Sequence, residues 1–335
     1  MSRPWQQNTG MSRGIPVKTA NPGLRLLFAT WLCAATAACA GVAPSVPIRL
    51  AGAAALVRID GLGACSFERP SVLDLDPSRP VVVLVHGCRA SGGRFRSLAE
   101  VFELHEQQTI CFDYDDRERI TKSGTRLARA LRELGRLIQA KRILVLGHSQ
   151  GGLVARWALS EGIGELHTDG GTEYRLVTVS SPFNGIAAAS DCGSRLYHTL
   201  SLGITVGVCH AVTGAKWSEI HPRAALVTAP PALRPVVQDH LAVITDERES
   251  CRRAGPDGRC LEDDFVFSLE EQAIDRLRFD RRVKTEEVAA GHAEIVGAPG
   301  VRPSKLLSIL KRHGILEPTP SGRELAFEAL LRRLF

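Results

Sequence analysis

The sequence lacks the patterns typical of zinc proteins and of nucleic-acid-binding proteins. It contains nine cysteines, but none forms a Cys-x-x-Cys pair or a Cys/His spacing of the kind that holds zinc, so we expect no metal. Four of the 42 lysines and arginines fall in the first 38 residues, which leaves 38 basic against 36 acidic residues, a net charge of +2. Such a balance gives no reason to expect nucleic acid as a partner. Internal repeats and low-complexity blocks are also absent.

The first 38 residues have the features of a secretory signal. Arg13, Lys18 and Arg25 precede an apolar stretch at 26–38, which ends in small residues before Cys39. Thr36-Ala37-Ala38-Cys39 resembles the lipobox of bacterial lipoproteins, in which the cysteine is lipidated. We therefore expect cleavage after residue 38 and a lipid anchor at Cys39 that holds the protein on the outer membrane, facing the periplasm or the surface. An uncleaved N-terminal anchor helix is the alternative.

After an N-terminal segment at 39–80, strand-like and helix-like segments alternate. The strand-like runs are 81–85, 108–113, 143–146, 174–180 and 241–245, and the helix-like ones are 94–105, 121–139, 152–160 and 303–313. This alternation predicts an α/β domain over 81–335, with a mostly parallel sheet covered by helices on both faces. Regularity fails at 183–240, where an insertion would lie over the ligand-binding edge of the sheet. A lid and a purely structural excursion both fit this insertion, and its apolar stretch at 200–212 is too short and too polar to span a membrane.

Gly147-His148-Ser149-Gln150-Gly151 joins the strand-like run 143–146 to the helix-like run 152–160. A serine on such a sharp strand-to-helix turn has its hydroxyl exposed above the sheet edge, and the flanking glycines leave room for the turn. We therefore predict that Ser149 is a nucleophile. The backbone N–H of Gln150 then lies beside an oxyanion formed at Ser149, and Cys88, after the strand-like run 81–85, is the expected second donor.

A nucleophilic serine needs a histidine base, and the base needs a carboxylate that orients it. In folds of this type the chain order is Ser, then Asp or Glu, then His. His292 and His313 follow every plausible acid; His313 lies at a helix C-terminus, where a cation complements the dipole, so we predict that His292 is the base. Asp246, directly after the strand-like run 241–245, and Asp264 are the candidate acids, and periodicity does not separate them.

Seven cysteines follow Cys39, and disulfides are expected in an exported protein. Cys251 and Cys260 flank a turn-rich loop suited to a local disulfide, and Cys192 with Cys209 is a weaker pair. Cys88 is more readily a disulfide partner than a reactive thiol, with Cys111 as the candidate. An odd number leaves at least one thiol free.

Several segments together resemble bacterial lipases and esterases of the α/β-hydrolase superfamily, close to the triacylglycerol-lipase and PGAP1-like branches. The resemblance rests on Val83-Leu84-Val85-His86-Gly87, the 147–156 segment with its second glycine and Arg156, Ser181-Pro182-Phe183-Asn184-Gly185 and Gly291-His292-Ala293-Glu294-Ile295. Such lipases carry Asp-Gly-x-Val-Ser around the acid. Because Asp264-Phe265-Val266-Phe267-Ser268 is similar, the resemblance implies Asp264 as the acid. The calcium site of some relatives has no matching residues, and no cofactor is implied.

We therefore expect an exported serine hydrolase that cleaves carboxylic esters, with lipid esters among its candidate substrates, through Ser149, Asp264 and His292. Two alternatives share the fold. Transfer of the acyl group to an alcohol instead of water would make the protein an acyltransferase, and loss of catalysis would leave an envelope binding protein.

Overall fold

The computed structural model describes residues 45–335 except 53, 69, 71, 139–141, 164–171, 191–203 and 299. The expected signal at 1–38 and the expected lipidation site at Cys39 lie outside the described residues, as does Cys192. In the part of the chain that the structure describes, no helix is both long and apolar enough to cross a membrane.

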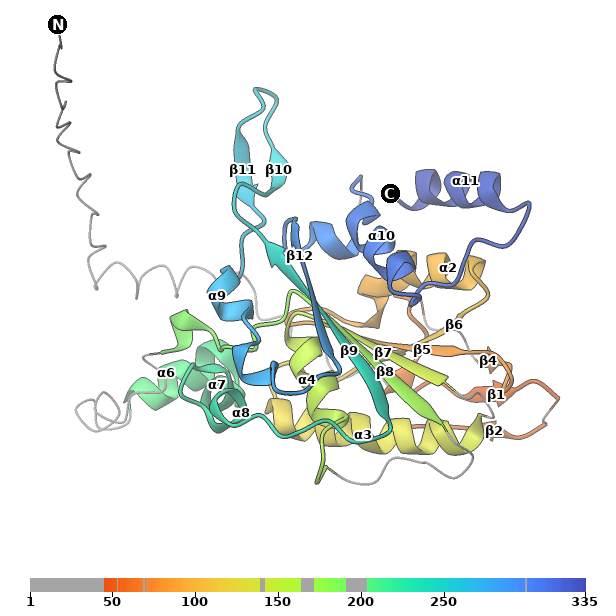
Figure 1. Ribbon diagram of the computed structural model, residues 1–335, viewed down its shortest axis with the longest axis horizontal. Coiled ribbons are helices and arrows are strands. Elements are labelled where there is room, and N and C mark those ends of the chain that lie inside the picture. Colours follow the sequence, from red (N-terminus) through yellow and green to blue (C-terminus); the bar gives the residue numbers. More distant parts are fainter. Residues whose placement is uncertain are drawn as a thin grey trace, which may run out of the picture. The chain divides into compact units, whose positions relative to one another are not determined.

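A seven-stranded sheet forms the centre of the fold, as the alternating pattern predicted (Figure 1). Its strand order is β12-β9-β8-β7-β5-β6-β3, and every neighbouring pair is parallel except β3 with β6. The strands are β3 (Leu62–Gly63), β5 (Val81–Val85), β6 (Gln108–Phe112), β7 (Arg142–His148), β8 (Glu173–Val179), β9 (Val237–Asp246) and β12 (Val283–Ala289). The inner strands are continuous apolar runs because helices cover both faces of the sheet.

Successive side chains of each strand enter two separate cores. Val81, Val83 and Val85 of β5 pack with α3 (Ile120–Leu137) and α4 (Gln150–Ala158) on one face. Val82 and Leu84 pack with α2 (Arg96–Leu104), α10 (Ser304–Arg312) and α11 (Glu324–Leu334) on the other. Burial of each such side chain contributes about 1.5–3 kcal/mol to the stability of the fold. The two cores therefore hold the strands in register, and the register determines which strand ends lie together at the edge of the sheet.

The N-terminal segment contributes strands to two of the sheets. Its strands β1 (Ile48–Leu50), β2 (Leu56–Val57) and β4 (Leu73–Leu75) form a small sheet in the order β2-β1-β4, and β3 extends the central sheet. A disulfide between Cys65 and Cys111 joins the segment after β3 to β6. The Cys88–Cys111 pair expected from the sequence is therefore wrong, and Cys88 is a free, exposed cysteine.

In its described residues, the 183–240 insertion has the α-helices α6 (Ile204–Thr213), α7 (Trp217–Ile220) and α8 (Ala225–Thr228). Arg117 donates hydrogen bonds to the carbonyls at the end of α6, and Thr121 bonds to Glu219 of α7. The insertion is thus attached to the segment that leads into α3. Short elements elsewhere are η1 (Gly92–Phe95), η2 (Ala187–Ala189), α9 (Leu269–Gln272), η4 (Asp275–Leu277) and η5 (Glu294–Val296).

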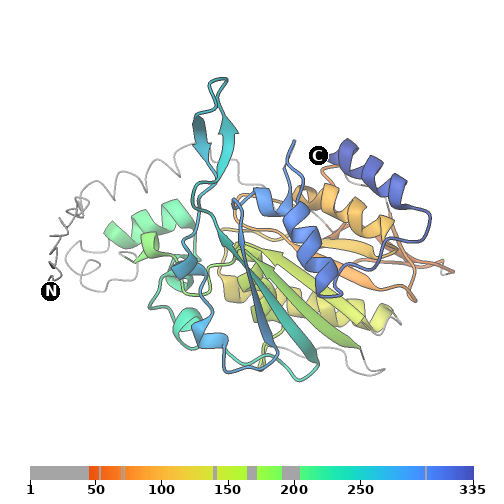
Figure 2. The same ribbon diagram turned by 45° about the horizontal axis from the view of Figure 1, so that its top comes forward.

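A two-stranded hairpin projects beyond the end of β9 (Figure 2). It consists of β10 (Cys251–Ala254) and β11 (Cys260–Asp263), which pair antiparallel, and every residue of both strands is exposed. The disulfide between Cys251 and Cys260, predicted from the sequence, closes the hairpin. Since the hairpin has no core of its own, the disulfide supplies a constraint that packing does not.

Candidate active site

Ser149 occupies a strained turn between β7 and α4, where its φ is +57° and its ψ −130°. Its backbone N–H donates to the carbonyl of Val179 at 2.8 Å. The glycines on either side are required by close backbone contact: a Cβ at Gly147 would lie 2.4 Å from the carbonyl oxygen of Gly151, and one at Gly151 would lie 2.2 Å from that of Val85. The strand, sharp turn and helix expected around this serine are all present.

His292 lies in the loop after β12, at the same sheet edge as Ser149. Its ring packs against the ring of His148 at 4.7 Å between centroids, and Nε2 of His148 donates to the carbonyl of His292 at 2.9 Å. Because His148 directly precedes Ser149, these contacts bring the imidazole next to the serine turn. Burial lowers the pKa of His148 well below its ordinary value, and His292 lowers it further, so His148 is neutral at physiological pH.

The carboxylate that contacts the imidazole of His292 belongs to Glu247, a residue that the sequence analysis missed. Oε1 of Glu247 accepts from Nδ1 of His292 at 2.8 Å and from the hydroxyl of Ser180 at 2.6 Å. Oε2 accepts from the backbone N–H groups of Val266 at 2.6 Å and Phe267 at 2.8 Å. With its proton on Nδ1, a neutral His292 has a free lone pair on Nε2, the arrangement that a general base requires.

Glu247 is ionised in spite of its burial. Burial raises the pKa of a carboxyl, but the hydrogen bonds from His292, Ser180 and the N–H of Phe267 outweigh it and hold the pKa of Glu247 below its ordinary value. Ser180 reaches the carboxylate from a left-handed backbone conformation, with φ +52°, directly after β8. A non-glycine residue in this conformation is strained, and such strain is often found at functional sites.

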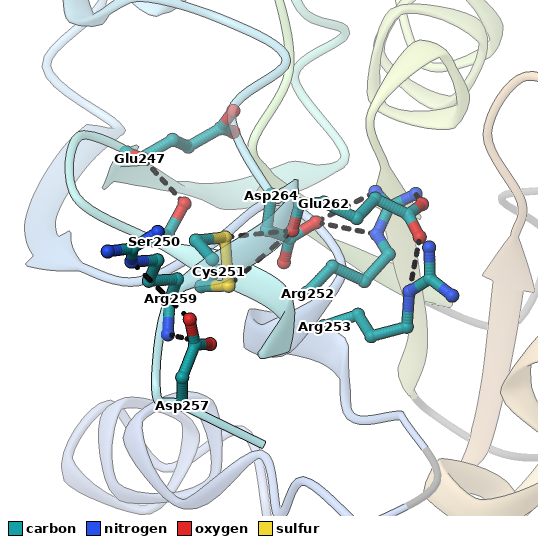
Figure 3. Close-up of a disulfide and its surroundings, with 10 residues drawn as sticks. Glu247, Ser250, Cys251, Arg252, Arg253, Asp257, Arg259, Glu262 and Asp264 are labelled. Atoms are coloured by element: carbon teal, nitrogen blue, oxygen red, sulfur yellow. Dashed lines mark hydrogen bonds and ion pairs between the residues drawn. A yellow bond between two sulfur atoms is a disulfide. The ribbon is translucent and has the colours of Figure 1, made fainter. Parts of the chain in front are cut away.

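The prediction that Asp264 orients the imidazole is wrong. Its carboxylate accepts instead from the backbone N–H groups of Ala293 and Glu294, each at 2.9 Å. It also accepts from Arg252 at 2.8 Å (Figure 3). Asp264 therefore holds the loop that follows His292. Among the described residues, its side chain forms no hydrogen bond with the imidazole of His292. Gly291 permits this approach, because a Cβ there would lie 2.3 Å from Oδ2 of Asp264.

The alternative prediction, that Asp246 orients the imidazole, is also wrong. Its carboxylate forms an ion pair with Arg248 at 2.6 Å, outside the site. Successive side chains of an extended segment point to opposite sides, so Asp246 and Glu247 at the end of β9 face in different directions. The sequence does contain a signal for Glu247. This residue directly follows Asp246 at the end of a strand-like run, and the chain order Ser, acid, His permits Glu as well as Asp.

The two predicted oxyanion donors flank Ser149. Gly87 comes so close to the serine that a Cβ there would lie 2.8 Å from Cβ of Ser149, and Cys88 follows directly. Lys216 of the insertion lies beside both donor residues. Lys216 is 5 % exposed. Its Nζ lies 2.6 Å from Oε1 of Gln150 and 3.1 Å from Sγ of Cys88.

Lys216 also joins these residues to the segment before α3. Its Nζ donates to the carbonyl of Asp116 at 2.7 Å and lies 3.6 Å from the carboxylate of that residue. The side-chain amide of Gln150 donates to the same carbonyl at 2.9 Å. Across the described ranges, no group of three or more His, Cys, Asp or Glu side chains could hold a metal ion.

The protein-family comparison covers the segment around the serine turn. A family described as "Putative serine esterase (DUF676)" matches residues 77–212, which contain β5, the Ser149 turn and α4. The chain has an α/β-hydrolase fold. The match covers 136 of the 335 residues, and its description is that of an esterase family. No curated protein matches the sequence.

Solved structures with similar folds include several bacterial and archaeal hydrolases. The mature lipase BlEst2 of Bacillus licheniformis is 14% identical, with a TM-score of 0.47 over 75% of this chain and 96% of that one. An esterase from Thermogutta terrifontis is 14% identical, with a TM-score of 0.43 over 77% and 90%. The esterase PF2001 of Pyrococcus furiosus is 17% identical, with a TM-score of 0.40 over 70% and 82%.

Proposed function

We propose that this α/β-hydrolase is an exported serine esterase in which Ser149, His292 and Glu247 form the catalytic triad. The observation that carries the proposal is the contact of 2.8 Å between Nδ1 of His292 and Glu247, next to a serine in a strained strand-to-helix turn. The residues follow the chain order Ser, Glu, His that the fold requires.

In the proposed reaction, His292 Nε2 takes the proton of Ser149 as the serine oxygen attacks the ester carbonyl carbon. The carbonyl π electrons move to oxygen, which becomes the oxyanion of a tetrahedral intermediate. Collapse of this intermediate breaks the bond to the alcohol, and His292 returns the proton to the leaving oxygen. Water then attacks the acyl-enzyme in the same way and releases the carboxylic acid.

Each stage places charge where the site offers a counter-charge. Glu247 stabilises the imidazolium that forms on His292, as a buried carboxylate does in other serine hydrolases. The N–H groups of Cys88 and Gln150 are the proposed donors to the oxyanion. The ammonium of Lys216, held against the side chains of both residues, fixes their positions and adds positive charge on the same side.

Export is the second part of the proposal. Disulfides at Cys65–Cys111 and Cys251–Cys260 support an oxidising compartment, and Cys209 is also disulfide-bonded. The basic and apolar pattern of residues 1–38 supports a secretory signal.

A fluorophosphonate probe tests the catalytic proposal because it reacts only with activated serines. We expect the full chain to be labelled on the peptide that contains Ser149, with no labelling of Ser149→Ala and much slower labelling of His292→Ala. Labelling that is equal in the wild type and in Ser149→Ala would show that another residue reacts and would refute the proposed nucleophile.

A further inference from the structure

A cavity separate from the catalytic residues lies between α4, α8, η4 and the segment that follows β8. Its walls enclose about 460 Å³ of space that no atom fills, part of which is open to solvent. Most of the wall is apolar and includes Leu153, Trp157, Leu226 and Ile274. Ser149, Glu247 and His292 are not among the lining residues.

Arg156 enters this cavity wall from the last turn of α4, and its guanidinium makes no direct pair with a described residue. The residue is 5 % exposed, and its Nε is buried without a hydrogen-bond partner. Among the described residues, none forms a hydrogen bond or an ion pair with its guanidinium. Burial of an unpaired charge is one of the costliest arrangements in a folded protein, so a guanidinium placed in this way calls for a counter-ion.

The protein groups near Arg156 do not supply one. Burial lowers the pKa of Arg156 to about 10, and although the carboxylate of Asp280 opposes this effect, Arg156 remains protonated at neutral pH. That carboxylate is itself bound to Arg282 at 2.6 Å and 2.8 Å. His240 is fully buried and has an unpartnered Nδ1; burial lowers its pKa to about 3, so it is neutral and offers no charge.

The rim of the cavity adds to the positive potential. Arg276 is one of the lining residues, and it is exposed. Its guanidinium donates to Oδ1 of Asn184 at 2.7 Å, which holds it at the rim. A cation at the base and a second at the rim, with apolar walls between them, fit a ligand that has a negative group at one end and an apolar tail.

We propose that this cavity binds a small carboxylate, whose charged group pairs with Arg156 and whose short apolar tail contacts the walls. A guanidinium presents parallel N–H donors that match the two oxygens of a carboxylate. The apolar lining favours an acid with an apolar tail over a bare anion. The proposal concerns a site of its own and does not depend on the proposed reaction at Ser149.

Calorimetric titration of the full chain with three probes at equal ionic strength tests this site. Butyrate carries both the charge and the tail, formate carries the charge alone, and butanamide carries the tail without charge. We expect butyrate to bind most tightly, formate more weakly, and butanamide without detectable heat. Arg156→Met should weaken butyrate binding about tenfold or more, because a charge-assisted pair is lost.

The matched control is Arg278→Met, which changes an arginine that is 71% exposed and paired with Asp275. This variant should bind butyrate as the wild type does, and Arg156→Lys, which keeps the cation, should lose less affinity than Arg156→Met. Equal butyrate affinity in the wild type and Arg156→Met would overturn the proposal. Absence of butyrate binding to the folded wild type would overturn it as well.

Thermal unfolding gives a second and independent readout. Without carboxylate, Arg156→Met should unfold about 2 °C or more above the wild type, because it removes a buried charge that has no partner. Butyrate should raise the melting temperature of the wild type but not that of Arg156→Met. If Arg156→Met unfolds at a lower temperature than the wild type in carboxylate-free buffer, Arg156 has a structural partner and the proposal is wrong.

Discussion

At the scale of single residues, a carboxylate without access to solvent is stable as an ion only when donors surround it. Glu247 meets this condition: its side chain is fully buried, and both oxygens accept hydrogen bonds from side chains or backbone N–H groups. The same donors fix its position, so Oε1 remains on Nδ1 of His292. A fixed partner selects one tautomer of the imidazole, and this selection is the proposed contribution of Glu247 to catalysis.

We predict that Glu247→Gln lowers kcat for a p-nitrophenyl ester by a factor on the order of 10³–10⁴, because the amide favours the wrong tautomer of His292. Asp246→Asn is the matched control: it changes the preceding residue, whose carboxylate pairs with Arg248 outside the site, and should leave kcat unchanged. Steady-state kinetics on both variants measures this. A large loss in Asp246→Asn together with a small loss in Glu247→Gln would reverse the assignment.

The pKa of Glu247 makes a prediction for stability. Because the folded state lowers this pKa, the ionised carboxylate stabilises the fold above its unfolded pKa, and the contribution is lost as the pH falls through the folded value. The advantage of the wild type over Glu247→Gln in free energy of unfolding should therefore shrink as the pH falls from about 7 to about 3. Urea unfolding at several pH values measures it. An advantage that grows toward acid pH would mean that the folded state raises the pKa.

At the scale of elements, the insertion is held to the core through polar contacts beside the serine turn. Thr121 bonds to Glu219 at 2.6 Å, and Lys216 bonds to Gln150 at 2.6 Å. Since Gln150 follows Ser149 directly, the 183–240 insertion contacts the serine turn through Lys216.

Lys216→Met should lower kcat about tenfold or more with little change in KM, because it removes positive charge and a brace from the oxyanion side of the site. The matched control is Lys122→Met, whose ammonium is 64% exposed and pairs with Glu118. This control should leave kcat and KM unchanged. A normal kcat in Lys216→Met would show that the lysine serves only to attach the insertion.

The sequence predicted best those elements whose pattern is local. The predicted strand at 81–85 has the same bounds as β5, and the predicted helix at 121–139 differs from α3 by at most two residues at either end. The alternating pattern did not include β12, because this strand lies at the edge of the sheet and none of its residues is buried. An edge strand does not need the continuous apolar run that marks an inner strand.

The site was predicted in part for the same reason. Ser149 and His292 follow from a local motif and from chain order, whereas the choice between Glu247 and Asp264 depends on which carboxylate reaches the ring in space. Both carboxylates are buried, but Glu247 contacts the ring of His292 whereas Asp264 contacts the backbone of the loop that follows it. The difference lies in the direction of the two side chains. The Cys65–Cys111 pair likewise depends on the pairing of β3 with β6, which the sequence does not reveal.

At the scale of the whole molecule, the proposed export and anchor determine where the enzyme would act. We predict that the protein incorporates labelled palmitate, that Cys39→Ala loses the label, and that the wild type stays with the membrane fraction in high salt. A lipoprotein carries two or three acyl chains, and more than one chain is needed for stable attachment. Recovery of the wild type in a salt-soluble periplasmic fraction would remove the anchor and leave export standing.

Ester hydrolysis through an acyl group on Ser149 is tested by trapping this intermediate. The full chain is mixed with p-nitrophenyl butyrate, quenched in acid within the first turnovers, digested and analysed by mass spectrometry. We expect one butyryl group on the peptide that contains Ser149, and none on that peptide in Ser149→Ala. Rapid turnover of the ester with a butyryl group on another residue, or with Ser149→Ala as active as the wild type, would contradict it.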